Sequence, residues 1–390
     1  MRIAVPREIV PRETRVALVP ETVAKLAKSG LAVTVETGAG AQAMFLDDAY
    51  RAAGATIAPD ARAAYADADV VLKVREPVLN EPLGAHEADL VPEGAALIAF
   101  LGRDAQSEVA RKLAARRVTA FSMEMVPRIS RAQKMDALSS MSTIAGYKDA
   151  LIAADSLGKI FPLLMTAAGT IAPARVFVLG AGVAGLQVIA TSRRLGAVVE
   201  AFDVRPAVRE EVQSLGATFV GHELLDAAAV AAGGYAKEMT PEQQAKQREL
   251  VADRLKQSDV VVSTAMVPGK KAPVLITEAM VRDMRPGSVI VDLAAEMGGN
   301  CELTQPGADV VRHNVLILGP MNLAATLPVH ASQMYARNIF ALLTHLVKDG
   351  ALHLDFDDEI TRESCLVGST GGAGSAAVSA PPALAAGRTP

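Results

Sequence analysis

Three glycines with the spacing Gly-x-Gly-x-x-Gly, at 180–185, constrain the fold of this chain more than any other feature. They follow an apolar run and open a helical pattern, and Asp203 comes about 20 residues later, after the next apolar run. In such a unit the first glycine permits a tight turn, the second lets a phosphate approach the backbone, and the third allows close helix packing. We therefore expect a parallel α/β unit with a dinucleotide at the amino end of its helix. The alternative is that the glycines serve packing alone.

The expected nucleotide-binding residues lie on the glycine turn and beyond the next strand. The helix N-terminus offers N–H groups and a favourable dipole to the pyrophosphate. Asp203 would bind the adenosine ribose and repel a 2′-phosphate, which favours NAD(H) over NADP(H). Arg205 opposes this preference, because a nearby arginine accommodates such a phosphate. The candidates are Gly180, Gly182, Val183, Ala184, Gly185, Asp203, Val204 and Arg205.

Short apolar runs alternate with helical patterns over most of the chain. This alternation predicts an α/β fold of two Rossmann-like, doubly wound domains, each with a parallel sheet covered on both faces, and a cleft between them. Strands are expected at 3–5, 32–37, 69–74, 96–101, 118–122, 176–180, 198–203, 259–264, 288–293 and 315–319. Helices are expected at 20–29, 106–115, 183–195, 207–215, 241–257 and 274–284.

The region 327–347 is expected to form a long amphipathic helix that returns to the first domain. The first domain is then discontinuous, with residues 1–134 and 328–367, and residues 135–327 form the NAD(H)-binding domain. Residues 368–390 consist mainly of small residues and proline without a period that could bury a face, so we expect a disordered tail. Such a tail is either a frayed end or a tether toward a membrane partner.

Composition excludes several classes of function. The net charge of −4 gives no support for nucleic-acid binding. The longest uncharged window, 176–192, is interrupted by glycines and is shorter than the roughly 20 apolar residues of a membrane span. The amino terminus has no signal-peptide core, and Cys301 and Cys365 have neither disulfide nor metal-ligand spacing. These features favour a soluble cytoplasmic protein without a metal site.

A polar segment at 127–149, PRISRAQKMDALSSMSTIAGYKD, carries most of the information about function. It places two arginines, a glutamine, an aspartate and a serine within twelve positions, more donors and acceptors than a helix needs for packing alone. Together with GAGVAG at 180–185 and GGYAKEM at 233–239, it resembles the NAD(H)-binding component of proton-translocating NAD(P) transhydrogenases. The resemblance runs from MRIAVPRE at the start to about residue 366.

This resemblance implies roles for individual residues. Arg128, Gln133, Asp136 and Ser139 match the polar loop that contacts the nicotinamide end of the nucleotides, and Gln133 is the candidate for reaching the second nucleotide. The same residues are also compatible with a helix cap and an interdomain salt-bridge cluster. The long connection at 221–240 corresponds to a loop that closes over bound nucleotide. It adds Gly234 and Tyr235 to the nucleotide-binding candidates, and Ala265 is added after the following strand.

The resemblance also implies a reaction and its partners. Hydride would pass directly from C4 of one nicotinamide to C4 of another, with no proton exchanged at the reacting carbons. NADP(H) would bind to a partner subunit, and a membrane-spanning subunit would carry the protons. The chain itself would be a homodimer, peripheral to the inner membrane through its partners, with no span of its own.

Two other functions remain open at this point. Alanine dehydrogenases resemble the same chain, and their substrate-binding cations correspond to Arg15 and Lys73. Their catalytic histidine and aspartate, however, correspond to Gly102 and Glu296, which argues against oxidative deamination. A catalytically silent NAD-sensing subunit is the second alternative. Residues 320–327 also depart from a more polar transhydrogenase segment, so contacts there are not carried over.

Overall fold

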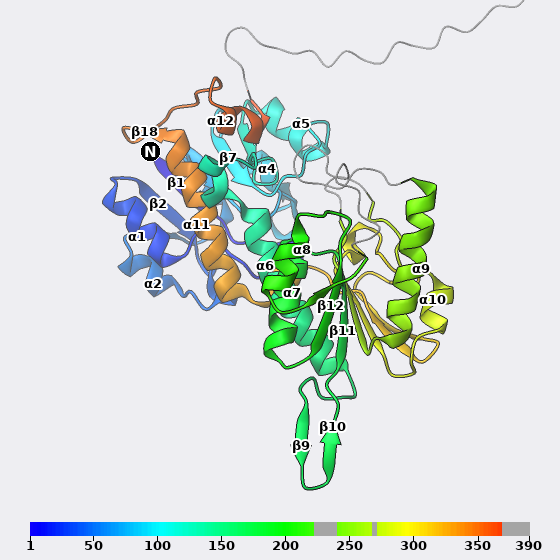
Figure 1. The fold of residues 1–390 in the computed structure, drawn as a ribbon. Coiled ribbons are helices and arrows are strands. Elements are labelled where there is room, and N and C mark those ends of the chain that lie inside the picture. Colours follow the sequence, from blue (N-terminus) through cyan, green and yellow to red (C-terminus); the bar gives the residue numbers. More distant parts are fainter. Residues whose placement is uncertain (222–239, 267–270, 369–390) are drawn as a thin grey trace, which may run out of the picture.

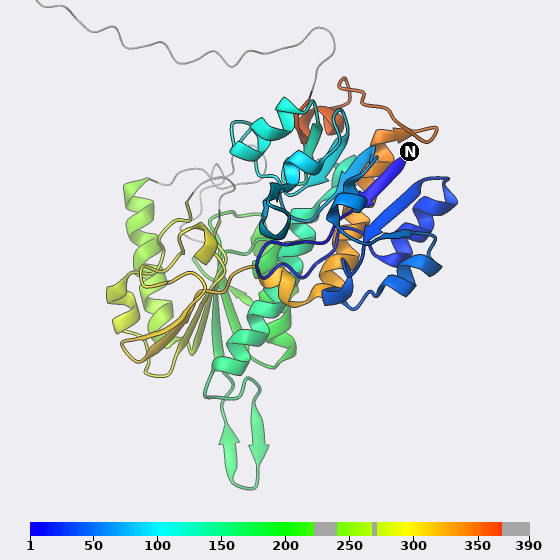
Figure 2. The ribbon, with the colours of Figure 1, turned by 180° about the vertical axis from the view of Figure 1, so that it is seen from behind.

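The computed structural model describes residues 1–221, 240–266 and 271–368. Within these residues, the chain forms two seven-stranded sheets with helices packed around each of them (Figure 1). Figure 2 shows the two sheets from behind, with the N-terminal strand in the first of them. The fold is α/β with two Rossmann-like units, as the sequence predicts.

The first sheet is built mainly from the N-terminal third of the chain. Its strands are β1 (Arg2–Val5), β2 (Ala32–Glu36), β3 (Thr56–Ala58), β4 (Val70–Leu72), β7 (Ala96–Ala99), β8 (Thr119–Ser122) and β20 (Cys365–Val367). They have the order β20-β8-β7-β4-β1-β2-β3. All neighbours are parallel, except that β20 pairs antiparallel with β8. The end of the described chain therefore returns to the edge of the first sheet.

The second sheet contains the glycine fingerprint. Its strands are β11 (Arg175–Leu179), β12 (Val198–Phe202), β13 (Thr218–Phe219), β14 (Val260–Ser263), β15 (Val289–Asp292), β16 (Asp309–Arg312) and β17 (Val315–Leu318). Their order is β13-β12-β11-β14-β15-β17-β16, and only the pairing of β16 with β17 is antiparallel among these strands. The order reverses between β11 and β14. Ligands of such sheets bind at the carboxyl ends of the strands beside this reversal, where β11 runs into the glycine turn.

Helices cover both faces of each sheet. The described α-helices are α1 (Pro20–Lys28), α2 (Asp47–Ala52), α3 (Ala61–Tyr65), α4 (Glu87–Leu90), α5 (Glu108–Ala115), α6 (Ala137–Ser156), α7 (Val183–Arg194), α8 (Val208–Ser214), α9 (Pro241–Gln257), α10 (Glu278–Arg282), α11 (Pro328–Leu346) and α12 (Glu359–Ser364). In β11, Val176 and Val178 pack with residues of α6, α7 and α8, whereas Phe177 and Leu179 pack with residues of α9 and α10. The strand is buried on both faces, which explains its continuous apolar sequence.

Helix α6 contributes to the cores of both sheets. Ile144 joins the core of the first sheet, and Ala153 joins the core of the second. Between them lies Gly146, where a Cβ atom would stand 2.2 Å from the carbonyl oxygen of Ala184 in α7. The absence of a side chain at this position therefore lets α6 and α7 pack in direct backbone contact. Because α6 is shared, domain boundaries at 134/135 and 327/328 stay a prediction.

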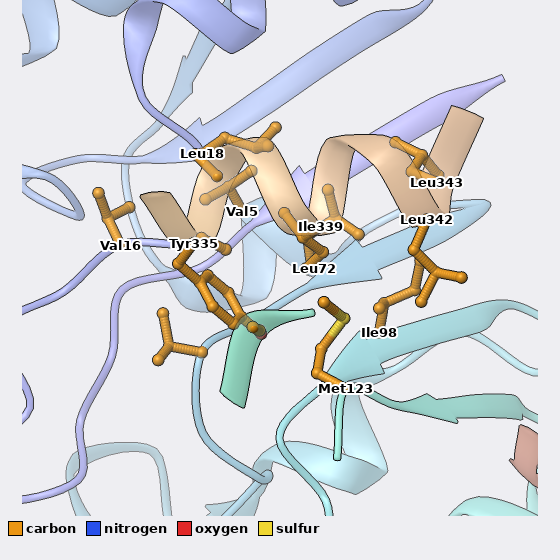
Figure 3. Packing of buried hydrophobic residues seen from close by; sticks show 14 of the residues in the cluster. Val5, Val16, Leu18, Leu72, Ile98, Met123, Tyr335, Ile339, Leu342 and Leu343 are labelled. Carbon is orange, nitrogen blue, oxygen red and sulfur yellow. The ribbon is translucent and has the colours of Figure 1, made fainter. Parts of the chain in front are cut away.

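Helix α11 returns to the first sheet, as the amphipathic pattern at 327–347 predicts. Figure 3 shows Ile339 of α11 beside Leu72 of β4, and Leu342 directed toward Ile98 of β7. The Tyr335 hydroxyl donates a hydrogen bond to the backbone carbonyl of Lys73 at 2.8 Å. Helix α11, although it lies near the end of the chain, therefore packs its apolar face on the first sheet.

The sequence pattern misses short and exposed elements. They include an exposed, projecting hairpin of β9 and β10 (Figure 1) and the antiparallel edge strands β16 and β20. Of the helix expected at 274–284, only residues 278–282 are helical, in α10. The polar segment at 127–149 is largely helical, because it contains η3 and the first part of α6. The short and exposed elements have too few buried residues to produce a clear period, whereas α6 buries residues against both sheets and so has no single apolar face. The smaller elements are β5 (Leu79–Asn80), β6 (Ala85–His86), β9 (Leu164–Thr166), β10 (Gly169–Ile171), β18 (Val347–Lys348), β19 (Ala351–Leu352) and the 3₁₀ helices η1 (Ala41–Ala43), η2 (Glu81–Leu83), η3 (Ser130–Met135), η5 (Ala295–Met297) and η6 (Leu323–Thr326).

Among the described residues, no helix combines the length and the apolar character that crossing a membrane requires. The tail expected to be disordered lies almost entirely outside the described residues, which end at 368.

Candidate functional site

The glycine turn connects β11 to α7 in a very confined space. Gly180 has φ +94°, a backbone conformation that residues with a side chain rarely adopt. A Cβ atom on Gly185 would lie only 1.9 Å from the carbonyl oxygen of Gly180. That oxygen also accepts a hydrogen bond from the Thr264 hydroxyl at 3.0 Å. The turn is thus fitted for close approach of a phosphate to the start of α7.

Asp203 follows β12 and lies beside the glycine turn, where the fingerprint predicts it. Its buried carboxylate accepts a hydrogen bond from the backbone N–H of Ala181 at 2.7 Å. The remaining contacts come from Arg205, whose backbone N–H and Nε lie 2.9 Å from Oδ1 and whose Nη2 lies 2.8 Å from Oδ2. The carboxylate expected to bind a ribose therefore already holds a bidentate ion pair with Arg205.

The other candidates around the turn have different surroundings. Val183 opens α7 and is 43% exposed, so its side chain is accessible beside the turn. Ala184 is buried, and its carbonyl oxygen faces Gly146 of α6. Val204 is half-buried and packs against the α9 side of the second sheet. Gly234 and Tyr235 lie outside the described residues, so their contact with nucleotide stays a prediction.

Ala265 stands at the carboxyl end of β14, but its backbone groups already have partners. Its N–H donates to Asn300 Oδ1 at 3.1 Å, and its carbonyl accepts from Asn300 Nδ2 at 2.9 Å. The same Nδ2 donates to the carbonyl of Pro273 at 2.8 Å. Asn300, which is fully buried, therefore holds the wall of the site beside Gly180. Sequence reasoning did not select Asn300, although it lies in VDLAAEMGGN next to Glu296.

Asp292, another residue that sequence reasoning missed, organises the loop that carries Asn300. Its buried carboxylate accepts hydrogen bonds from the backbone N–H groups of Asn300 and Cys301 and from the hydroxyls of Ser263 and Thr304. The contacts span β14, β15 and the following loop. A buried carboxylate with this many donors fixes the loop geometry.

Replacing Asn300 by alanine is expected to weaken NADH binding about tenfold, because the backbone amide and carbonyl of Ala265 lose their partners. Titration of NADH fluorescence measures the change, and the chain contains no tryptophan to interfere. Asn300→Asp keeps the acceptor but places a carboxylate against two carbonyl oxygens, so it is not expected to rescue binding. Unchanged affinity in Asn300→Ala would remove Ala265 from the nucleotide site.

The polar segment at 127–149 combines structural and accessible groups. Asp136 caps α6, with Oδ1 accepting from the Ser139 N–H at 2.8 Å and Oδ2 from the Ser139 hydroxyl at 2.6 Å. Arg131 forms an ion pair with Asp358 at the start of α12, at 2.9 Å. Gln133 is exposed and makes no side-chain hydrogen bond to the described residues. The capping interpretation is therefore correct for Asp136 and Ser139, while Gln133 stays accessible for another molecule.

A pocket of about 200 Å³ lies between the end of β8 and the start of α6. Arg128 and Asp136 line it, and neither Gln133 nor Ser139 belongs to its lining. Its lining also contains three other charged residues, Arg103, Glu124 and Glu363, together with apolar side chains. The structure thus brings two of the four predicted catalytic residues to one pocket, with both signs of charge on its walls.

Helix α6 connects this pocket to the glycine turn. Asp136 lies at its amino end, and Gly146 contacts α7 ten residues later. That separation is about 15 Å along the helix axis, at about 1.5 Å per residue. The pocket and the start of α7 are therefore joined by one helix, with Asp136 at the pocket and Gly146 at the contact with α7.

The two cations expected to correspond to those of alanine dehydrogenases, Arg15 and Lys73, pair with carboxylates of this chain. Arg15 is bidentate to Glu13, with Nε at 2.7 Å and Nη2 at 2.6 Å. The fully buried Lys73 lies 3.0 Å from Glu87 and 3.3 Å from Glu8. Burial alone would lower the pKa of Lys73, but these two carboxylates raise it above its usual value. Both cations are charged, and both already have anionic partners.

The acid/base positions of an amino-acid dehydrogenase have other roles here. Gly102 has φ +72°, and its carbonyl accepts a hydrogen bond from the Ser122 hydroxyl at 2.7 Å. Glu296 accepts a hydrogen bond from the backbone N–H of Asn322. Position 102 therefore supplies a backbone turn and no titratable side chain.

Comparison with known proteins settles the family. Residues 4–145 match the family description "Alanine dehydrogenase/PNT, N-terminal domain", and residues 150–371 match "Alanine dehydrogenase/PNT, C-terminal domain". The chain belongs to the alanine dehydrogenase/PNT family. The resemblance inferred from the motifs is thereby confirmed.

Relatives within the alanine dehydrogenase/PNT family include both enzymes considered above. The first part of NAD(P) transhydrogenase subunit alpha of Rhodospirillum rubrum is 50% identical over 370 residues, 94% of this chain and 96% of that protein. A transhydrogenase structure from Sinorhizobium meliloti matches with a TM-score of 0.83 and 41% identity, covering 94% of this chain and 99% of that one. An L-alanine dehydrogenase structure matches with a TM-score of 0.77 and 28% identity, covering 94% of each chain.

Proposed function

We propose that this chain is the NAD(H)-binding component of a proton-translocating NAD(P) transhydrogenase. The observation that carries the proposal is that Arg128 and Asp136 line a pocket at one end of α6, while position 102 has no acid/base side chain. The Rhodospirillum rubrum relative, 50% identical and named as a transhydrogenase alpha subunit, supports it. Hydride exchange between two nicotinamides fits such a site, because it needs positioning rather than proton transfer at the reacting carbons.

The residues present fit a bound dinucleotide. Because Gly185 has no Cβ atom, α7 can start directly against the backbone of Gly180, and the turn stays narrow. The N-terminus of α7 then offers N–H groups to the pyrophosphate. When bound, NADH supplies the hydride from C4 of its nicotinamide. Asp203 binds the adenosine ribose, and Arg128 and Asp136 orient the nicotinamide half. Gln133 extends toward the second nucleotide, and Ser139 fixes the carboxylate of Asp136.

The rest of the reaction belongs to partner subunits. A partner binds NADP(H) and brings its nicotinamide against this chain, and a membrane-spanning partner carries the protons. The chain is cytoplasmic and is held at the inner membrane by these contacts. The word "subunit" in the names of the relatives supports this division of labour.

A homodimer is included in the same proposal. The hairpin of β9 and β10 projects from the second sheet and exposes apolar side chains, with Met165 77% and Ile171 48% exposed (Figure 1). Exposed apolar residues on a projecting hairpin favour burial against a second copy. Sedimentation velocity of the purified chain tests this, and a monomer at tens of micromolar would contradict it.

The function is tested by mixing the purified chain with a purified NADP(H)-binding transhydrogenase component, without any membrane. Hydride should pass between NADH and an NAD analogue in the presence of NADP(H), because ring-to-ring transfer needs only the two sites in contact. The chain alone should neither catalyse this transfer nor oxidise L-alanine with NAD. Turnover of L-alanine would favour the alanine dehydrogenase function, and an inactive mixture would favour an NAD-sensing subunit.

Gln133→Asn and Asp136→Asn are each expected to slow hydride transfer by more than about tenfold, because misplacement by about 1 Å costs up to a hundredfold. NADH affinity should change little, since neither residue holds the adenosine half. Stopped-flow mixing in a single turnover measures the rate. Lys134→Gln, an exposed neighbour, serves as the control. Wild-type rates in both variants would remove these residues from the reaction.

A further inference from the structure

The ion pair between Asp203 and Arg205 occupies the place where the adenosine ribose is expected. Both oxygens of Asp203 are engaged, and the guanidinium contributes two of the four hydrogen bonds. The Asp203 side chain is 5% exposed and that of Arg205 is 25% exposed. The carboxylate is therefore the more shielded half of the pair, and the guanidinium is the more accessible half.

The four hydrogen bonds differ in how easily they can be exchanged. The N–H groups of Ala181 and Arg205 belong to the backbone and keep the carboxylate in position. The Nε and Nη2 groups sit at the end of a flexible side chain and can leave without moving the fold. A ribose diol offers two O–H donors, which can replace these two N–H donors on the same oxygens.

The position of the guanidinium gives this exchange a second consequence. Arg205 Nη2 lies 3.6 Å from the place that a Cβ atom on Gly182 would take. It therefore lies above the second glycine, on the side where the pyrophosphate approaches the backbone. A guanidinium released from Asp203 here stays beside the anionic oxygens of the ligand, including a 2′-phosphate.

We propose that Arg205 is a specificity-determining residue, exchanged from Asp203 when nucleotide binds, that limits how strongly the site rejects a 2′-phosphate. Asp203 repels the phosphate and the released guanidinium attracts it, so the preference for NADH over NADPH is the difference between two opposed effects. The inference rests on the proposed nucleotide site. Removal of the guanidinium leaves the repulsion uncompensated and sharpens the preference for NADH.

The test compares dissociation constants of NADH and NADPH, measured by fluorescence titration, in Arg205→Gln and in the wild type. The ratio of the NADPH constant to the NADH constant should rise about tenfold in Arg205→Gln, the size expected for a lost hydrogen bond to a charged group. Arg205→Lys keeps the positive charge but loses the planar pair of N–H donors, so its ratio should lie between those of the wild type and Arg205→Gln. Arg209→Gln removes an exposed arginine at the start of α8 and should leave the ratio unchanged.

Competition with ADP-ribose and with its 2′-phosphate measures the same preference without the nicotinamide. If Arg205 acts on the adenosine half, Arg205→Gln should change the ratio of these two dissociation constants as much as it changes the ratio for NADPH and NADH. An unchanged or lower ratio in Arg205→Gln would overturn the proposal, as would an equal loss of affinity for both nucleotides. Failure of the proposed nucleotide site has a different result, because the wild type would then bind neither NADH nor NADPH.

Discussion

Replacing Gly185 by alanine is expected to weaken NADH binding roughly a hundredfold, because forcing extra atoms into a packed site costs about 1–3 kcal/mol. The added Cβ would stand 1.9 Å from the carbonyl oxygen of Gly180, so the turn must open or α7 must move. That oxygen also holds the Thr264 hydroxyl, and any shift is passed to the wall beside Ala265. NADH titration measures the loss.

The matched control is Gly158→Ala, just beyond the end of α6. A Cβ atom at Gly158 has no neighbour within 4 Å, so this variant should bind NADH like the wild type. Circular dichroism must show that Gly185→Ala keeps its helices, so that lost binding is not lost folding. Wild-type affinity in a folded Gly185→Ala protein would show that the nucleotide does not depend on the close turn.

Replacing Asp149 by alanine or asparagine is expected to raise the melting temperature at neutral pH by about 5 °C, because neither variant has a carboxyl group whose ionisation is disfavoured in the folded protein. Asp149 lies on α6 and is fully buried, and neither carboxyl oxygen has a hydrogen-bond partner. Burial, followed by the field of Asp292, raises the pKa of Asp149 well above its usual value. The acid is therefore unfavourable in the folded state.

The pH dependence follows from the direction of this shift. A carboxyl whose pKa is higher in the folded protein costs nothing below its unfolded pKa of about 4, and its cost grows as the pH rises toward the folded value. The gain in Asp149→Asn should therefore be largest at neutral and alkaline pH and shrink near pH 4. Asp292 is the charged group whose field acts on Asp149, so its hydrogen-bonded carboxylate maintains the shift.

Asp155→Asn is the control for Asp149, because Asp155 lies on the same helix but is exposed. Its melting temperature should follow the wild type at every pH. Differential scanning calorimetry over the pH range measures all of these variants. A lower melting temperature of both Asp149 variants at neutral pH would mean that the carboxyl has a stabilising partner in solution.

Much of the fold was predictable because it depends on short-range patterns. The apolar runs that form β11, β14 and β15 are buried on both faces, and their sequences are correspondingly continuous. The glycine turn and Asp203 lie within a single strand–helix–strand unit, so their spacing alone places them together. The amphipathic pattern of α11 likewise predicts that it covers a sheet.

The candidate site was predicted only incompletely, because its polar groups find partners far along the chain. Arg131 pairs with Asp358, 227 residues away, and the Asn300 side chain holds Ala265, 35 residues away. No periodic pattern in the sequence indicates that residues so far apart are in contact. The exposed strands β9 and β16 were missed for a related reason, since residues that bury no face show no period.

The sequence by itself therefore determined the parallel α/β architecture and the position of the glycine turn between β11 and α7. Only the tertiary structure decided which of the candidate polar groups are already used: Asp136 and Ser139 in a helix cap, and Asp203 in an ion pair with Arg205. The physical reason is that periodicity records which faces are buried, whereas hydrogen bonds and ion pairs depend on distances that exist only after the elements have packed.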